Sequence, residues 1–195
     1  MRAYPVGLAV IWMAAAVAYA ADEGRESVKV RILNYAGVPQ SVLRHAQSEA
    51  ADSYRAAGIQ VEWTVCSFGK QATDCPELSP AERQVKIVPD APAEEIASGG
   101  AYARAIQPVD GTPGFLVHVF YRRVEAGARR ADCSVETLLG TVMAHEVAHL
   151  FGLGHTTGMM KANFDRKDLQ QAAMGKLLFG EAEGKRLRSA LVSVP

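Results

Sequence analysis

Three histidines and a glutamate, spread over only eleven residues, are the side chains in this sequence that could do chemistry together. They are His145, Glu146, His149 and His155. On a helix, residues four apart lie on the same face, so the rings of His145 and His149 would lie one turn apart. Two neutral imidazoles in that arrangement can hold one zinc ion at ~2.1 Å each. The spacing therefore predicts a metal site.

The third histidine requires the chain to turn back. His155 follows His149 by six residues, and on a continuous helix it would lie ~9 Å further along the axis. Gly152 and Gly154 stand between them, and glycine adopts left-handed conformations without a Cβ penalty. We therefore predict three histidine ligands, with Gly152 as the turn glycine.

This ligand set predicts hydrolytic chemistry. Three histidines leave one coordination position of a catalytic Zn²⁺ open, where the pKa of a bound water falls to about 7. Glu146 is not needed as a ligand, so it can accept the proton of that water as it attacks a carbonyl. The two remaining histidines, His45 and His118, lie in an amphipathic and an apolar segment and are interpreted as structural.

Composition excludes several other classes of protein. The chain has 195 residues, of which 49% are hydrophobic and 22% charged, and its formal net charge is zero. It is too apolar for a disordered chain, and it has no basic excess that would indicate a nucleic-acid partner. The length fits one domain with a substantial core.

The first twenty residues have the pattern of a signal peptide. Arg2 is the only charge before Asp22, an apolar stretch covers residues 6–17, and Ala18-Tyr19-Ala20 follows. The stretch is shorter than the ~20 apolar residues of a membrane span, although an uncleaved anchor helix is the alternative. We predict a signal peptide at 1–20 and a single catalytic domain at 21–195. This domain would be exported to the periplasm or the extracellular space, without a stable membrane anchor.

Export changes how the three cysteines are interpreted. Cys66 and Cys75 flank a short segment with Gly, Lys and Asp, and an oxidising compartment favours a disulfide between them. Three cysteines allow three single pairings, of which proximity favours this one. Cys133 would then be unpaired, either as a small buried hydrophobe or as a metal-directed or regulatory thiol.

Alternating hydrophobicity predicts the strands. Residues 28–32 have Val and Ile alternating with Lys29 and Arg31, which indicates a half-buried strand. Further strands are predicted at residues 59–65, 85–87, 101–106 (an edge strand) and 115–121 (a central strand).

Helical periodicity and capping residues predict the helices. One opens at Pro39 and Ser41 and is closed by Gly58; its buried face is predicted to hold Val42, Ala46, Ala50 and Tyr54. A long buried helix is predicted at 135–151, capped by Ser134. Two more follow, at 181–192 and from Asp165 onward; the latter would have Leu169, Ala173 and Leu177 on one side. This order predicts an α+β fold, an α/β-like sandwich of a mixed sheet and two long helices.

Residues 145–155 match HExxHxxGxxH, the extended zinc signature of the metzincin metallopeptidases. The resemblance implies that the three histidines bind the catalytic zinc and that Glu146 is the general base. Thr157-Gly158-Met159-Met160 resembles the Met-turn of the same clan, with Met160 as the better match and Met159 as the alternative. The chain looks most like compact, matrixin-like secreted bacterial members.

The same resemblance implies a fold and a substrate. Metzincin domains have a twisted, mostly parallel sheet with an antiparallel edge strand, a backing helix and a buried zinc helix. The edge strand, here 101–106, would border the cleft and pair with an extended protein or peptide substrate. The implied function is a secreted zinc endopeptidase. The alternatives are a zinc hydrolase of small amides or cell-wall peptides, and a non-catalytic zinc-containing binding module.

Two departures from the clan's pattern bear on specificity. The predicted Met-turn follows His155 after only five residues, which is short, so the specificity pocket is expected to differ. Ala162 stands two residues past Met160, where astacin-like members carry an extra tyrosine ligand.

Overall fold

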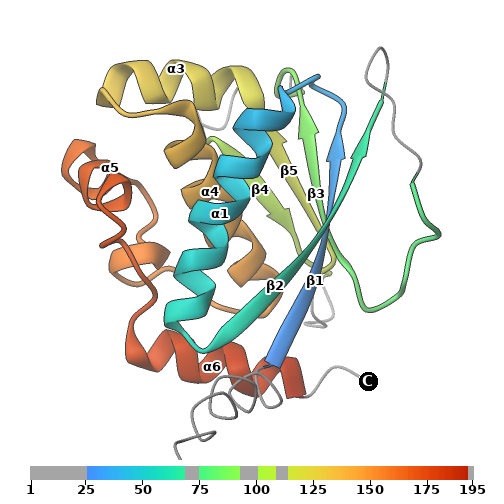
Figure 1. Ribbon diagram of the computed structural model, residues 1–195. Coiled ribbons are helices and arrows are strands. Elements are labelled where there is room, and N and C mark those ends of the chain that lie inside the picture. The colour runs from blue at the N-terminus through green and yellow to red at the C-terminus, as the bar shows by residue number, and fades with distance from the viewer. Residues whose placement is uncertain (1–25, 69–74, 93–100, 109–113, 193–195) are drawn as a thin grey trace, which may run out of the picture.

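The computed structural model describes residues 26–68, 75–92, 101–108 and 114–192 (Figure 1). The predicted signal peptide at 1–20 and the first residues of the predicted mature chain lie outside this part. Within it, no helix combines the length and the hydrophobicity that crossing a membrane requires.

The centre of the fold is a five-stranded sheet with the strand order β2-β1-β3-β5-β4. Its strands are β1 (Glu26–Asn34), β2 (Ile59–Ser67), β3 (Arg83–Val88), β4 (Ala103–Ile106) and β5 (Leu116–Phe120). Neighbouring strands run parallel except β4, which pairs antiparallel with β5 at the edge. The predicted mixed, mostly parallel sheet with an antiparallel edge strand is confirmed.

Helices cover one face of this sheet and one of its ends. They are α1 (Gln40–Ala56), α3 (Tyr121–Ala131), α4 (Val135–Leu150), the short 3-10 helix η2 (Gly158–Met160), α5 (Arg166–Ala173) and α6 (Glu181–Val192). Helices α1, α3, α4 and α5 lie on one side of the sheet, and α6 passes the end at which β1 begins (Figure 1). The hydrophobic core lies between the sheet and α1 and α4.

Close packing against α1 fixes the position of α4. A Cβ atom on Gly140 would lie 2.6 Å from the carbonyl oxygen of Ala46 and 2.6 Å from the Cβ of Glu49, so glycine lets the helices touch. One turn further along, the buried Tyr54 hydroxyl donates a hydrogen bond to the Ala144 carbonyl at 3.0 Å. Burial raises the pKa of this tyrosine well above its usual range.

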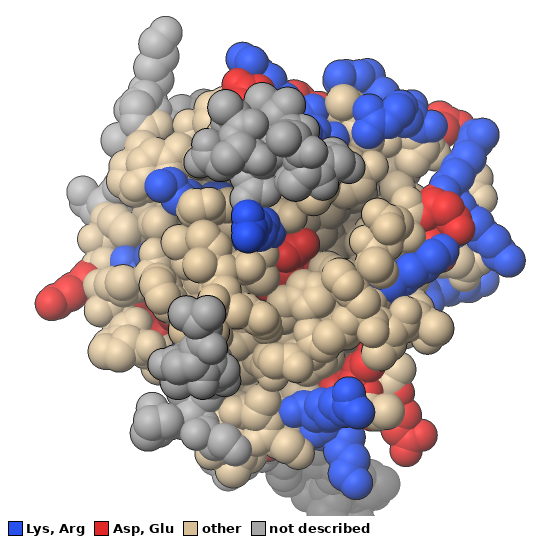
Figure 2. All heavy atoms as spheres, turned by 180° about the vertical axis from the view of Figure 1, so that it is seen from behind, with Lys and Arg blue, Asp and Glu red and all other residues tan. Residues whose placement is uncertain are grey.

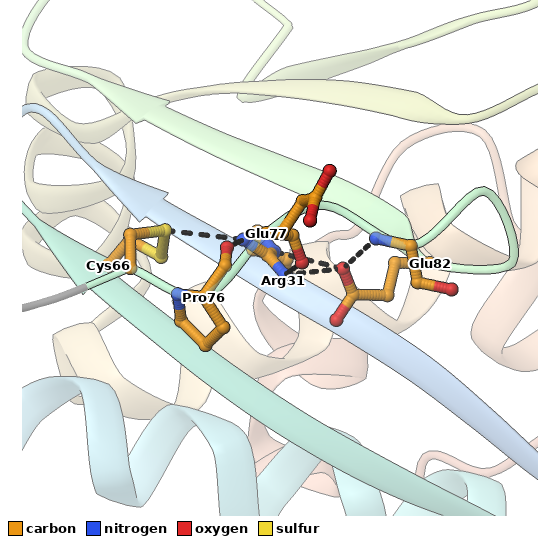
Figure 3. Close-up of a disulfide and its surroundings, with 7 residues drawn as sticks. Arg31, Cys66, Pro76, Glu77 and Glu82 are labelled. Carbon is orange, nitrogen blue, oxygen red and sulfur yellow. Dashed lines mark hydrogen bonds and ion pairs between the residues drawn. A yellow bond between two sulfur atoms is a disulfide. The ribbon is translucent and has the colours of Figure 1, made fainter.

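The opposite face of the sheet carries a short segment, residues 75–82, that we call the strap. It begins at Cys75, which is joined to Cys66 of β2 by a disulfide with a Cα–Cα distance of 5.3 Å. Beneath it, Arg31 of β1 is only 4% exposed. Its guanidinium bonds to Glu82 at 2.6 and 3.0 Å and to the Glu77 carbonyl at 2.9 Å (Figure 3). The predicted half-buried strand is therefore wrong at Arg31, because the strap covers that face.

The apolar run predicted as one strand at 115–121 is divided between two elements. Strand β5 ends at Phe120, and Tyr121 begins α3, a helix that was not predicted from the sequence. Val124, Ala128 and Ala131 of α3 are buried, at the spacing of a helix face. The sequence contains this helical spacing, but the apolar run of β5 continues directly into Tyr121, so the pattern was interpreted as a longer strand.

The predicted buried faces of two helices are confirmed at Ala46, Ala50, Tyr54 and Leu169, but each is wrong at one position of its helix. In α1 the buried residue of the first turn is Leu43, whereas Val42 is half-buried. In α5 Ala172 is buried and Ala173 is exposed, and Leu177 lies beyond the helix. The helix ends because Gly175 takes a left-handed conformation with φ +66°.

Candidate metal centre

Helix α4 carries the first two histidines and is buried over most of its length. Ser134 caps its start as predicted, because its hydroxyl accepts a hydrogen bond from the Thr137 amide at 3.0 Å. Of the two histidines, His145 is only 5% exposed, whereas His149, one turn later, is half-buried. Both rings point to the same side of the helix, since their centroids lie 4.6 Å apart.

Glycine makes the turn after α4. Gly152 has φ +79°, and its amide donates to the His149 carbonyl at 2.9 Å. The Leu153 amide donates to the Ala148 carbonyl at 3.3 Å. Together these two bonds form a Schellman C-cap, which sends the chain back toward the histidines. Gly154 does not have a positive φ, so the prediction that both glycines make the turn holds only for Gly152.

The turn brings His155 back to the other two rings. The Nε2 atom of His149 lies 3.0 Å from Nε2 of His145 and 3.2 Å from Nε2 of His155. One ring nitrogen from each histidine falls within 4.8 Å of the other two. His155 is exposed, so the cluster runs from the core to the surface.

Backbone carbonyls fix the protonation of two of these rings. Nδ1 of His145 lies 2.8 Å from the carbonyl oxygen of Met159, and Nδ1 of His149 lies 2.6 Å from that of Leu153. A carbonyl oxygen can only accept, so Nδ1 carries the proton in both rings. In each neutral ring, Nε2 is then unprotonated, and its lone pair faces the other rings of the cluster. Metal-binding histidines are oriented by such contacts of the other ring nitrogen.

The arrangement of these three nitrogens favours binding of a metal ion over protonation of the rings. Two facing Nε2 lone pairs cannot hydrogen-bond each other, so they repel unless a cation lies between them. Burial lowers the pKa of His145 to about 4, and burial also lowers that of His149. A tetrahedral zinc ion at 2.0–2.1 Å from each ligand places its ligand nitrogens ~3.3 Å apart. This spacing is close to the observed one.

Glu146 lies beside the cluster on α4, facing the edge strand. Burial raises the pKa of its carboxyl to about 7, and a backbone hydrogen bond with Ala105 of β4 lowers it in part. The side-chain amide of Gln107, just past β4, donates to the carbonyl of His149. The edge strand is thus attached to α4 at two places that adjoin the histidines.

The segment after His155 packs against the buried side of the histidine cluster. It forms η2, in which Met159 and Met160 are both buried. The Met160 carbonyl accepts a hydrogen bond from the Thr156 amide at 2.9 Å, and the Met159 carbonyl is the Nδ1 partner of His145. The part played by the Met160 side chain as the Met-turn methionine stays a prediction.

The other predicted residues lie outside this cluster. His45 is exposed on α1, and His118 is half-buried in β5, paired in register with Lys86 and Arg104. Cys133 is half-buried and unpaired in the described part of the chain, and burial raises its pKa. That position gives no support to a metal-directed thiol.

The main-chain contacts that orient the two rings and Glu146 were not predicted. The carbonyls of Leu153 and Met159 and the backbone of Ala105 are main-chain groups, which carry no signal in the side-chain sequence. Only the Leu153 contact could have been inferred from the sequence, because a left-handed Gly152 directs the carbonyl of the next residue back toward the end of the helix.

Comparison with known proteins gives a match at the level of the fold. No protein-family model and no curated protein matches the sequence. Among solved structures, the fold is similar to the crystal structure of archaemetzincin (amzA) from Methanopyrus kandleri, with a TM-score of 0.52. The two sequences are 14% identical, and the match covers 85% of this chain and 96% of that chain. The mixed α/β architecture is therefore shared with a solved protein over nearly its whole length.

Proposed function

We propose that this chain is a zinc-dependent metallopeptidase whose ligands are His145, His149 and His155. The observation that carries the proposal is the convergence of three Nε2 atoms, two of them on rings whose Nδ1 is bound to a carbonyl. The fold likeness to a protein named archaemetzincin and the HExxHxxGxxH pattern support it independently of that geometry.

Within this proposal, Glu146 is the general base. Zinc, when bound, would polarise the substrate carbonyl and lower the pKa of a water molecule, so that this water could act as the nucleophile. The carboxylate of Glu146 would take the proton of the attacking water and pass it to the leaving nitrogen. Burial raises the pKa of this carboxyl above its usual range, which makes it a stronger base than an exposed glutamate.

The substrate proposed is an extended stretch of protein or peptide. Strand β4 is the edge of the sheet, and its Ala105 contacts Glu146. A peptide added to an edge strand has its backbone held in register, which would set a scissile bond against the base. We further propose that the chain acts as an endopeptidase outside the cytoplasm. The disulfide is compatible with this location.

The test is cleavage of casein by the purified zinc-loaded protein. We expect one zinc per chain and activity that a chelator abolishes and added zinc restores. Glu146→Gln should keep the zinc yet lose activity by ~10²- to 10⁴-fold, the range typical of a general base. Glu136→Gln, in the first turn of the same helix, is the matched control and should cleave as the wild type does.

Each alternative has its own outcome. Turnover of small amides or cell-wall peptides, but not of casein or a peptide library, would replace the endopeptidase with another zinc hydrolase. Stoichiometric zinc without turnover of any of these would indicate a binding module. A Glu146→Gln enzyme as fast as wild type would remove Glu146 from its assigned role.

A further inference from the structure

A pocket lies at the end of the sheet where β1 begins, next to α6. Its volume is about 160 Å³, and it is lined by Ser27, Val28, Lys29, Ala81, Arg83, Phe151 and Leu191. The described pairing of β1 with β3 starts only at Val30, opposite Arg83. The β3 side of residues 27–29 therefore borders the pocket instead of a strand. None of the proposed zinc ligands lines it.

Arg83 places a buried positive charge in this pocket. Its side chain is only 5% exposed. Its Nη1 donates to the Ala81 carbonyl at 3.4 Å, and its Nε has no hydrogen-bond partner. No carboxylate in the described part of the chain forms an ion pair with it. A buried charge without a counterion is costly.

Arg31 shows what a satisfied guanidinium of equal burial looks like in this fold. Arg31 is 4% exposed and bonds to a carboxylate and to backbone carbonyls of the strap. Arg83 instead has its Cζ atom 5.0 Å from the ring centroid of Phe151, a cation–π contact. The ring holds the guanidinium in place but does not accept its in-plane N–H groups.

The geometry points to a second ligand site in this pocket, which binds a small oxyanion, either a carboxylate or a phosphate, through Arg83. With Nη1 turned to Ala81, the Nε–Nη2 edge remains, and this edge matches two oxygens of an oxyanion. Nε is covered in the described conformation, so a two-point contact needs the guanidinium to rotate. Lys29, exposed where it borders the pocket, adds a second positive charge.

The site is tested by thermal unfolding of the full-length, zinc-loaded protein in rising inorganic phosphate or acetate, at constant ionic strength. A ligand that binds only the folded state raises Tm in a saturable way. We expect this for wild type and for Arg44→Met, an exposed cation on α1 that serves as the control. Arg83→Met should bind at least tenfold more weakly. Comparing phosphate with acetate shows which oxyanion the pocket prefers.

Anion binding at the histidine cluster is distinguished by repeating the titration after zinc removal. The difference in anion binding between wild type and the Arg83 variant should persist without zinc. Its failure would therefore be distinguishable from a failure of the proposed peptidase activity. If Arg83→Met does not fold, Arg83→Lys replaces it, and loss of the two-point fork should still weaken binding several-fold. A wild-type Tm that neither anion raises, or an anion effect unchanged in the Arg83 variant, would overturn the proposal.

Discussion

At the scale of single residues, main-chain groups decide what the histidines can do. The imidazoles of His145 and His149 present a lone pair to the cluster because two carbonyls hold their Nδ1 protons. One of these carbonyls belongs to Leu153, which follows the left-handed Gly152. The backbone conformation of one glycine therefore affects both the direction of the chain toward His155 and the orientation of His149.

Gly152→Ala tests this dependence. A non-glycine residue in the left-handed region costs ~1–2 kcal/mol, and any relief of that strain would move His155. We expect a lower Tm and at least tenfold weaker zinc binding, measured by competition with a chromogenic chelator. Gly154→Ala is the matched control, since Gly154 lacks a positive φ and a Cβ there would meet nothing within 4 Å. Equal zinc affinity in the two variants would contradict the argument.

At the scale of elements, contacts with two neighbouring elements position α4, which carries two of the three proposed zinc ligands. Helix α4 lies against α1 at Gly140, and it is attached to the edge strand through Glu146 and His149. The contact with α1 sets the depth of the helix, and the contacts with the edge strand set the distance between Glu146 and that strand. The site is therefore held by the packing of whole elements as well as by its own turn.

Gly140→Ala tests the helix contact. Alanine favours a helix over glycine by ~1 kcal/mol, but its Cβ would lie 2.6 Å from the Ala46 carbonyl. The clash should outweigh the propensity, because overpacking costs ~1–3 kcal/mol. We expect a net loss of stability in urea unfolding of the metal-free protein. A more stable variant would show that the two helices separate easily.

At the scale of the whole molecule, most charged side chains lie outside the core. Figure 2 shows a face that is mostly uncharged, with Lys and Arg gathered mainly at its upper right edge and in a smaller group at the bottom. The strap is one exception, because Arg31, Glu82 and a disulfide lie together on the sheet face opposite the helices (Figure 3). There the sheet is covered by a buried ion pair instead of a helix.

Glu82→Ala would leave the Arg31 guanidinium buried without its counterion. Removing one partner of a buried pair costs ~3–5 kcal/mol, and the carbonyls of Pro76 and Glu77 offset part of this. We expect a loss of at least 2 kcal/mol, measured by urea unfolding. Asp52→Ala is the control, since its ion pair with Arg55 is exposed and should contribute ~1 kcal/mol or less. Similar losses in both would mean that the strap is not held by this pair.

Removing the disulfide tests the other attachment of the strap. Cys66 and Cys75 are nine residues apart, and closing so short a loop stabilises by ~2.5 kcal/mol in the chain-entropy model. The Cys66→Ser, Cys75→Ser double variant should lose about this much stability. Reductant should then have no further effect on its Tm. Cys133→Ser should leave the reductant sensitivity of the protein unchanged.

Much of the fold could be predicted because its signals are local. Strand alternation, Ser134 as a cap and Gly58 as a helix stop each depend on a few neighbouring residues. The errors arose where two local patterns adjoin or where a distant segment intervenes. Tyr121 ends an apolar run and also begins an amphipathic helix. Arg31 stands at a position that the alternation in β1 predicts to be exposed, but the strap buries it.

The sequence by itself determined which residues can form the site, since the spacing of His145, His149 and His155 with Gly152 specifies a helix followed by a reversal. Only the tertiary structure decided what surrounds them. It supplied the carbonyl from Met159 that orients His145, the contact of Ala105 with Glu146, and the pocket that Arg83 lines. The physical reason is range. Backbone geometry fixes where residues a few positions apart can lie, whereas contacts between distant segments depend on how the whole chain packs.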